Sequence, residues 1–210
     1  MTDPKWPDQL ASGLTELGLS FDAATRTRLL AFLALLQKWN KAYNLTAVRD
    51  PAEMVSRQLL DSLSVLPHIQ ADRILDVGAG GGLPGIPLAI ACPDRQFTLL
   101  DGNSKKTRFL KQCVLELKLS NVEVIHARAE DFVPAQPFDQ ITSRAFTALE
   151  NLVNWCGDLL APTGHFLAMK GQFPEEEVAR LPAQWQVKDD IRLSVPGCEG
   201  ARHLLIIDRV

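Results

Sequence analysis

The chain has 210 residues, 46% of them hydrophobic, and a formal net charge of −3. A chain of this length can bury one sizeable core and at most a small appendage. The slightly acidic balance excludes a protein that coats nucleic acid indiscriminately, so an RNA partner would need a local basic patch.

The sequence has no pattern of a membrane span, a signal peptide or a metal site. The longest apolar run, residues 29–36, is too short to cross a bilayer, and the start Met-Thr-Asp-Pro-Lys-Trp-Pro lacks the apolar centre of a signal peptide. The cysteines form no C-x-x-C pair that would hold zinc or exchange thiols; they are Cys92, Cys113, Cys156 and Cys198. We therefore expect a cytoplasmic protein with reduced cysteines, no metal and no membrane partner.

Residues 1–70 are predicted to form an N-terminal helical extension. Over residues 25–40, apolar side chains recur at helical spacing, which indicates an amphipathic helix that packs on another element. Asp50-Pro-Ala-Glu53 combines an N-cap, a proline at the first helical position and a glutamate at N3. This pattern predicts a helix over residues 50–66, ended by Pro67. The simplest interpretation of both helices is a cap on a sheet.

A glycine-rich loop directly follows the first predicted strand, residues 73–77. The apolar side chains of this strand are typical of one buried on both faces. Five glycines then let the backbone turn sharply and approach a ligand closely; they are Gly78, Gly80, Gly81, Gly82 and Gly85. This layout predicts a site for a nucleoside cofactor.

Two classes of cofactor use such a loop. Residues 80–85 match the G-x-G-x-x-G pattern of dinucleotide-binding folds, but Pro84 and Pro87 crowd the helix turn that would face a pyrophosphate. Asp76 places an acid near the mouth of the site, and no P-loop Lys-Ser/Thr follows. These residues favour the cationic S-adenosylmethionine, with NAD or FAD as the alternative.

The second predicted strand also ends in an acid, Asp101. In doubly wound folds, an acid at this position accepts hydrogen bonds from ribose hydroxyls. We therefore predict that Asp101 binds the cofactor. The alternative is that Asp101 only caps the helix that begins near Ser104.

From Arg73 onward, predicted strands and helices alternate, which indicates a mostly parallel sheet with right-handed crossovers. The predicted strands are residues 73–77, 96–100, 122–126, 138–143, 165–170, 185–187 and 203–209, and the predicted helices are 83–91, 105–119 and 149–160. The last two strands lack a comparable helix between them, so we expect an antiparallel edge. The expected fold class is α/β, with a Rossmann-like domain over residues 71–210 that forms one structural unit with the extension.

The helix predicted over residues 105–119 carries five cations beside its apolar face: Lys105, Lys106, Arg108, Lys111 and Lys118. Such a cluster can bind RNA, or it can simply be a solvated face. Both interpretations stay open at this point.

With the loop, Asp101 and seven strands together, the sequence resembles the class I S-adenosylmethionine-dependent methyltransferases. Several segments narrow the resemblance to the RsmG family, also called GidB: Trp39-Asn-Lys-Ala-Tyr-Asn-Leu-Thr46, Arg49-Asp-Pro51, Leu60-Asp-Ser-Leu63, Gly78-Ala-Gly-Gly-Gly-Leu-Pro-Gly-Ile-Pro87, Ala127-Arg-Ala-Glu-Asp131, Ser143-Arg-Ala-Phe146 and Met169-Lys-Gly171. This family comprises bacterial enzymes that methylate N7 of a guanine, position 527, in 16S ribosomal RNA. The resemblance implies that activity, S-adenosylmethionine as cofactor and the small ribosomal subunit or its precursor as partner.

The resemblance and the strand ends together nominate site residues. The predicted cofactor-binding set is Asp76, Gly78, Gly80, Gly82, Leu83, Asp101, Ala129, Glu130 and Arg144. Arg144 is also the candidate catalytic residue that fixes the target base, unless it only pairs with Asp76, Asp101 or Glu130. The predicted RNA-binding set is Asn44, Arg49, Arg57, Lys105, Lys106, Arg108, Lys111, Arg128 and Lys170.

The chain departs from the family at Gln58, where members often have a histidine. Glutamine cannot transfer protons, so we expect Gln58 to form hydrogen bonds to RNA or protein. Guanine N7 carries a lone pair and no proton, so its methylation needs no general base. The sequence also lacks an Asn/Asp-Pro-Pro-aromatic tetrapeptide and a Pro-Cys pair, in keeping with direct in-line transfer. The alternatives are a small-molecule or protein methyltransferase and a non-enzymatic ribosome-binding factor.

Overall fold

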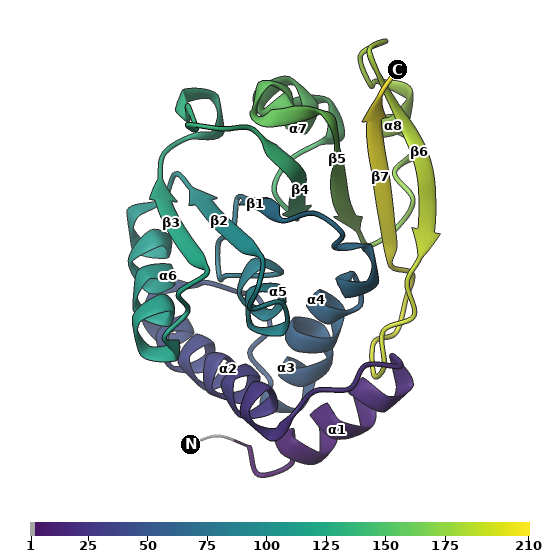
Figure 1. Cartoon of the computed structure of the whole chain (residues 1–210). Coiled ribbons are helices and arrows are strands. Elements are labelled where there is room, and N and C mark those ends of the chain that lie inside the picture. The colour runs from purple at the N-terminus through teal and green to yellow at the C-terminus, as the bar shows by residue number, and fades with distance from the viewer. Residues whose placement is uncertain (1–2) are drawn as a thin grey trace.

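A computed structural model describes residues 3–210 as a seven-stranded sheet with the strand order β3-β2-β1-β4-β5-β7-β6 (Figure 1). The strands are β1 (Arg73–Val77), β2 (Gln96–Asp101), β3 (Val122–His126), β4 (Phe138–Arg144), β5 (Leu160–Lys170), β6 (Trp185–Arg192) and β7 (His203–Arg209). β1 to β5 pair in parallel, whereas β7 runs antiparallel to β5 and β6. The predicted antiparallel edge is therefore confirmed.

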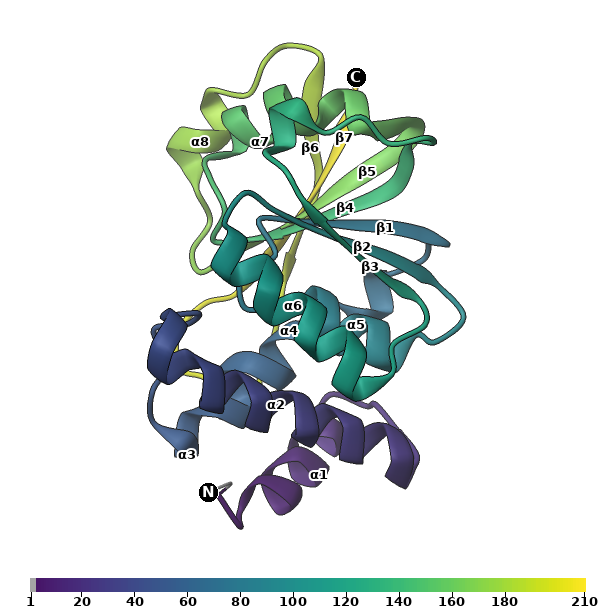
Figure 2. The same ribbon diagram turned by 90° about the vertical axis from the view of Figure 1, so that its left-hand side faces the viewer.

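The helices lie on both faces of this sheet. They are α1 (Trp6–Glu16), α2 (Ala23–Tyr43), α3 (Pro51–Met54), α4 (Asp61–Leu63), α5 (Gly85–Ala91), α6 (Ser104–Leu117), α7 (Leu149–Cys156) and α8 (Glu175–Ala179). Figure 2 shows α7 and α8 on one face, α5 and α6 on the other, and α1 and α2 as a further layer beneath α5 and α6. None of the helices within residues 3–210 combines the length and hydropathy needed to cross a membrane.

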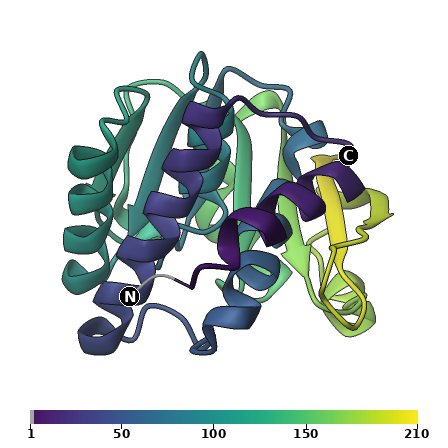
Figure 3. The ribbon, with the colours of Figure 1, turned by 90° about the horizontal axis from the view of Figure 1, so that it is seen from below.

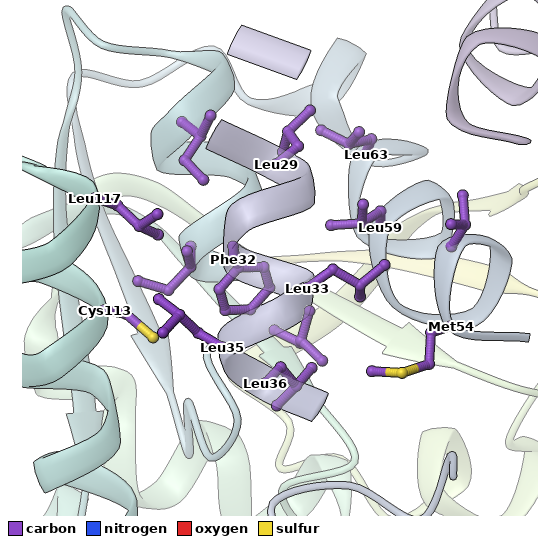
Figure 4. Close-up of a cluster of buried hydrophobic side chains, with 14 of the residues drawn as sticks. Leu29, Phe32, Leu33, Leu35, Leu36, Met54, Leu59, Leu63, Cys113 and Leu117 are labelled. Carbon is purple, nitrogen blue, oxygen red and sulfur yellow. The ribbon is translucent and has the colours of Figure 1, made fainter. Parts of the chain in front are cut away.

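The helical extension shares a core with the sheet domain. α2 begins at the N-cap Asp22, whose carboxylate accepts from the Thr25 N–H (2.7 Å), and ends at Asn44 in the left-handed conformation. Seen from below, α1 and α2 lie across the molecule (Figure 3). Figure 4 shows Phe32 and Leu33 of α2 between the side chains of α6 and those of residues 54–63. Because this one cluster also includes residues of α5 and β2, the extension and the domain form one packed unit.

The predicted elements match closely, with several differences. The helix predicted over residues 149–160 ends at Cys156, and β5 begins at Leu160 instead of at residue 165. α1 was not predicted as a separate helix; its Trp6 is buried, and the indole N–H donates to the Pro51 carbonyl (2.8 Å). α8 was not predicted either, and β6 is longer than expected because pairing with β7 carries it to Arg192. These differences arise from contacts between distant segments, which local patterns do not record.

The helix predicted over residues 50–66 is interrupted by a π-helical segment, Val55–Leu60. Its start is as predicted, since Asp50 is the N-cap and accepts from the Ala52 N–H (2.9 Å). The Asp61 N–H then donates to the Ser56 carbonyl, five residues back, instead of to the carbonyl four back. Such a bulge rotates the residues that follow it, and π-bulges occur frequently at functional sites.

Candidate active site

The candidate site lies where the strand order reverses, between β1 and β4. β2 and β3 lie on one side of β1, while β5 lies beyond β4. In open α/β sheets, the crevice outside the carboxyl ends of the strands at such a switch point binds ligands. The glycine loop follows β1 at this crevice, and Arg144 ends β4 beside it.

The glycine loop has a left-handed backbone at Gly78, Gly80 and Gly82. Gly78 has φ +67°, and both its N–H and the Ala79 N–H donate to the Leu100 carbonyl of β2 (2.9 and 3.1 Å). A Cβ on Gly78 would collide with the Phe146 ring. Glycine is therefore required at position 78 by its backbone conformation and by the close approach of an aromatic side chain.

Asp76 lies beneath this loop and not at the mouth of the site. Its carboxylate is 1% exposed, and Oδ2 accepts from the Gly85 N–H (2.9 Å) at the start of α5. Burial raises the pKa of Asp76 to about 7, against the lowering effects of the Gly85 hydrogen bond, Arg144 and Thr142. The prediction of direct cofactor contact by Asp76 is therefore replaced by a supporting role for the loop.

Asp101 ends β2 and joins the glycine loop to the start of α6. Its Oδ2 accepts from the Gly80 N–H (2.9 Å), and its Oδ1 accepts from the Asn103 N–H (2.8 Å). The cap of α6 is Asn103, which accepts from the Lys105 and Lys106 N–H groups, so Asp101 is not the cap. These two backbone hydrogen bonds hold the Asp101 carboxylate in place at the edge of a cavity.

The first cavity, of about 300 Å³, lies over the ends of β1, β2 and β4. It is lined by Val77, Gly78, Leu100, Asp101, Gly102, Lys106, Ala127, Arg128, Ala129, Glu130, Ala145, Phe146 and Trp155. Four residues of the predicted cofactor set are among them: Gly78, Asp101, Ala129 and Glu130. The other five residues of the predicted set do not line this cavity. Four of them lie in or under the glycine loop: Asp76, Gly80, Gly82 and Leu83. The fifth, Arg144, lines the second cavity instead.

Two aromatic residues of the first cavity were not predicted. The Phe146 and Trp155 rings meet edge to face, with centroids 6.0 Å apart. Phe146 belongs to the Ser143-Arg-Ala-Phe146 segment, but Trp155 comes from α7, and no local pattern distinguishes it from a core residue. Together they give the cavity an apolar wall beside its acidic residues.

The second cavity, of about 390 Å³, adjoins the first through Ala145, which lines both. Its other lining residues are Thr46, Ala47, Val48, Arg57, Gln58, Asp61, Arg144, Met169, Lys170, Gly171, Leu193, Arg202 and His203. Ala145 itself has φ +51°, a left-handed conformation that is uncommon for a residue with a side chain. The chain therefore turns sharply between the two cavities.

Arg144 lines the second cavity, where it is bonded to the helical extension. Nη1 donates to Asp61 Oδ2 (2.9 Å) and to the Arg57 carbonyl (3.2 Å), and Nη2 donates to Gln58 Oε1 (2.9 Å). The pairing with Asp76, Asp101 or Glu130 that we considered is thus replaced by a pair with Asp61. Gln58 is 1% exposed and also donates to Thr46 Oγ1 (2.7 Å), so its partners lie within the chain.

The predicted RNA-binding residues do not form one surface. Lys105, Arg108 and Lys111 are exposed along α6, while Lys106 and Arg128 line the first cavity. Others are already partnered, since Arg49 donates to Asn44 Oδ1 (2.8 Å), Arg57 pairs with Glu53 (3.1 Å) and Lys170 pairs with Glu177 (2.7 Å). The charge of Lys170 is therefore compensated by Glu177 within the chain.

The first cavity fits an adenosyl cofactor better than a dinucleotide. The acids Asp101 and Glu130 are among its lining residues, and its aromatic wall, in which the Phe146 ring packs against Gly78, suits a planar base. Among residues 3–210, no three His, Cys, Asp or Glu side chains converge in a group that could hold a metal ion.

Comparison with known proteins agrees with this geometry. Residues 25–205 match the family model GidB, described as rRNA small subunit methyltransferase G. A relative from Marinobacter nauticus, named ribosomal RNA small subunit methyltransferase G, is 68% identical over 209 residues, which are 100% of this chain and 98% of the relative.

Solved structures show the same fold at low sequence identity. The O-methyltransferase TomG from Streptomyces achromogenes, which is involved in tomaymycin synthesis and was solved in complex with SAM, has a TM-score of 0.58 at 17% identity, with 100% of this chain and 99% of TomG covered. A SAM-dependent methyltransferase from Aquifex aeolicus has a TM-score of 0.58 at 17% identity, over 82% of this chain and 97% of that one. The chain therefore has the class I Rossmann-like methyltransferase fold, and it belongs to the rRNA small subunit methyltransferase G family.

Proposed function

We propose that this protein transfers a methyl group from S-adenosylmethionine to N7 of a guanine in 16S ribosomal RNA, the guanine at position 527. The observation that carries the proposal is the pair of adjoining cavities at the β1/β4 switch point. The first has an aromatic wall with two acids and two cations, and the second is lined by arginines. The family supports RNA as the substrate, and the two cavities offer one space for a methyl donor and one for its acceptor.

In the first cavity, S-adenosylmethionine would supply an electrophilic methyl group on a cationic sulfur. Asp101 would accept hydrogen bonds from the ribose hydroxyls, and Gly78 would let the cofactor approach the backbone. Ala129 and Glu130 would contact the adenine end, and their place after β3 in the lining of the same cavity supports this role.

In the second cavity, this chain needs only to position the guanine. N7 has a lone pair and no proton, so in-line attack requires no general base. The acid and base side chains there are already occupied: Asp61 accepts from two arginines, and His203 is bonded to Asp190 (2.7 Å). Such a site suits orientation and electrostatic stabilisation better than proton transfer.

RNA contact would extend beyond the cavities onto the exposed cations of α6. Lys105, Arg108 and Lys111 lie on the helix whose start borders the first cavity through Lys106. We propose that this helix binds RNA phosphates within the small subunit or its precursor, and that the reaction takes place in the cytoplasm, where bacterial ribosomal RNA is made.

The cofactor site is tested by Asp101→Asn. A charged acceptor of a hydrogen bond contributes about 1.5 to 3 kcal/mol, so the dissociation constant for S-adenosylmethionine should rise roughly 10- to 150-fold in calorimetry. Asp131→Asn is the matched control, because Asp131 lies near the first cavity but does not line it. Equal affinity in a folded Asp101→Asn variant would refute the assignment of Asp101.

The substrate is tested by incubating the protein with labelled S-adenosylmethionine and either free 16S rRNA or 30S particles that lack the modification. We expect label at N7 of one guanine, mapped by mass spectrometry of nuclease fragments. Label on another atom would refute the proposed product. Tight binding of S-adenosylmethionine without transfer to either form of RNA would favour a small-molecule or protein methyltransferase.

A further inference from the structure

One buried carboxylate in the second cavity holds two arginines that come from different parts of the chain. The Asp61 side chain is 7% exposed; its Oδ2 accepts from Arg144 Nη1 (2.9 Å), and its Oδ1 accepts from Arg202 Nε (3.1 Å). Arg144 ends β4, while Arg202 directly precedes β7. Asp61 begins α4, at the end of the π-helical segment. The helical extension thus fixes two guanidinium groups at the end of the sheet.

Each guanidinium keeps N–H donors for a ligand. A guanidinium has five N–H bonds. Arg144 uses three of them on Asp61, Gln58 and the Arg57 carbonyl, and none of the hydrogen bonds within residues 3–210 involves its Nε. Arg202 donates from Nε to Asp61 and from Nη1 to the Ala201 carbonyl, and its Nη2 has no acceptor among the described residues. Both side chains line the cavity.

The wall of the second cavity carries one excess positive charge. Two guanidinium groups share the single carboxylate of Asp61. The other two cationic side chains of the lining have acidic partners of their own, Arg57 with Glu53 and Lys170 with Glu177, and the His203 ring is bonded to Asp190. An excess positive charge attracts an anion and repels a sulfonium. Paired guanidinium forks match the geometry of phosphate oxygens.

We propose that Asp61 is a positioning residue that holds Arg144 and Arg202 as a clamp for the RNA phosphate next to the target guanine. The inference rests on the proposed function and adds to it the group that the second cavity recognises. A phosphate held by the clamp places the attached nucleoside beside Ala145, the residue that lines both cavities. Gln58 completes the support, because it links Arg144 to Thr46, another residue of the cavity lining.

A phosphate clamp and an ordinary structural ion pair can be told apart by what a substitution changes: RNA binding and methyl transfer for the clamp, folding stability for the ion pair. A structural pair would affect folding stability and leave the salt dependence of RNA binding unaltered. A phosphate contact releases counterions, so its loss lowers the slope of log K against log salt by about 0.7 to 0.9. A positioning carboxylate makes no phosphate contact of its own, so its loss leaves that slope and reduces the rate of methyl transfer.

The test compares Arg202→Ala and Asp61→Asn with the control Arg26→Ala. Arg26 is an exposed arginine near the N-terminus of α2. Binding to 30S particles is measured over a range of salt, and single-turnover methyl transfer is measured at saturating particles and cofactor. We expect a slope lowered by about 0.7 to 0.9 for Arg202→Ala only. We expect Asp61→Asn to keep the slope and to lower the single-turnover rate at least about tenfold, since misplacement of a bound substrate has effects of this size.

Rescue and non-additivity separate positioning from folding. Arg202→Lys keeps the positive charge but loses the forked guanidinium, so it should keep the salt slope of RNA binding and lower the single-turnover rate of methyl transfer. This variant also tests the clamp if Asp61→Asn does not fold. In an Arg144→Ala/Arg202→Ala background, Asp61→Asn should cause no further loss of rate, because there is no clamp left to position. An unchanged slope in Arg202→Ala, or a full further loss in the triple variant, would overturn the inference.

The same experiment separates this inference from the proposed function. Wild-type protein that methylates no form of 16S rRNA refutes the proposed function. Wild-type protein that methylates the RNA, with Arg202→Ala and Asp61→Asn indistinguishable from Arg26→Ala, refutes the clamp alone. Calorimetry with S-adenosylmethionine should give the same affinity for the Arg202 and Asp61 single variants as for the wild type, because neither residue lines the first cavity.

Discussion

The buried carboxyl of Asp76 should make the stability of this protein depend on pH. Asp76 is 1% exposed, and burial raises its pKa from 3.8 to about 7. Since the folded-state pKa lies above the unfolded one, the contribution of Asp76 to stability is fully present below about pH 4. It is lost progressively as the pH rises through about 7. The difference of about three pKa units corresponds to about 4 kcal/mol.

Asp76→Asn isolates this effect, because asparagine resembles the protonated acid. Its carbonyl can accept from the Gly85 N–H, and its amide can donate toward Thr142 Oγ1, which lies 3.4 Å from the present Oδ1. Near pH 4 the variant and the wild type should have similar free energies of unfolding. Above about pH 7 the variant should be more stable by about 4 kcal/mol, because its buried group does not ionise.

The measurement is chemical denaturation of both proteins between about pH 4 and pH 8, analysed by linear extrapolation. Asp139→Asn on β4 is the control, since Asp139 is exposed and its substitution should change stability by only a few tenths of a kcal/mol. A constant difference between Asp76→Asn and the wild type across this range would refute the argument from burial.

Two further predictions concern the loop and the RNA surface. Gly78→Ala should lower the affinity for S-adenosylmethionine at least tenfold, because it strains a backbone at φ +67° by about 1 to 2 kcal/mol and displaces the Phe146 ring. Gly18→Ala is the control, because Gly18 also has a positive φ but an added Cβ would meet no neighbouring atom. If Gly78→Ala bound S-adenosylmethionine as tightly as Gly18→Ala in calorimetry, the steric argument would be wrong. Substituting Lys105, Arg108 and Lys111 by alanine together should lower the salt slope of RNA binding by about 0.7 to 0.9 for each phosphate contact, whereas an unchanged slope would identify a solvated face.

The sequence by itself determined the order of the strands along the chain and four of the residues that line the first cavity. Each signal was local: a buried strand, a run of glycines, an acid at a strand end. Parallel strands bring their carboxyl ends to one edge, so residues that follow different strands meet there without any further information. Gly78 and Asp101 could be assigned to one cavity on this ground before the structure was known, whereas Ala129 and Glu130 were named by the family resemblance, which their place after a strand end supports.

Other assignments needed the tertiary structure because the same local pattern permits two outcomes. Asp101 ends an apolar strand and Asp76 is the last residue but one of another, yet Asp76 points under the loop to the Gly85 N–H, whereas Asp101 borders the cavity. The cations of the predicted RNA-binding set also looked alike in sequence. Whether an acid lies within reach of each side chain, as Glu177 does for Lys170, is decided by packing.

The arginine pair in the second cavity was decided by the tertiary structure alone. Asp61 meets Arg144 across 83 positions of the chain and Arg202 across 141. A π-helical segment that no sequence pattern indicated places Asp61 between them. Periodicity and capping describe interactions within a few residues, whereas an ion pair of this kind depends on how the helical extension packs on the sheet, and that packing is set by the whole buried core.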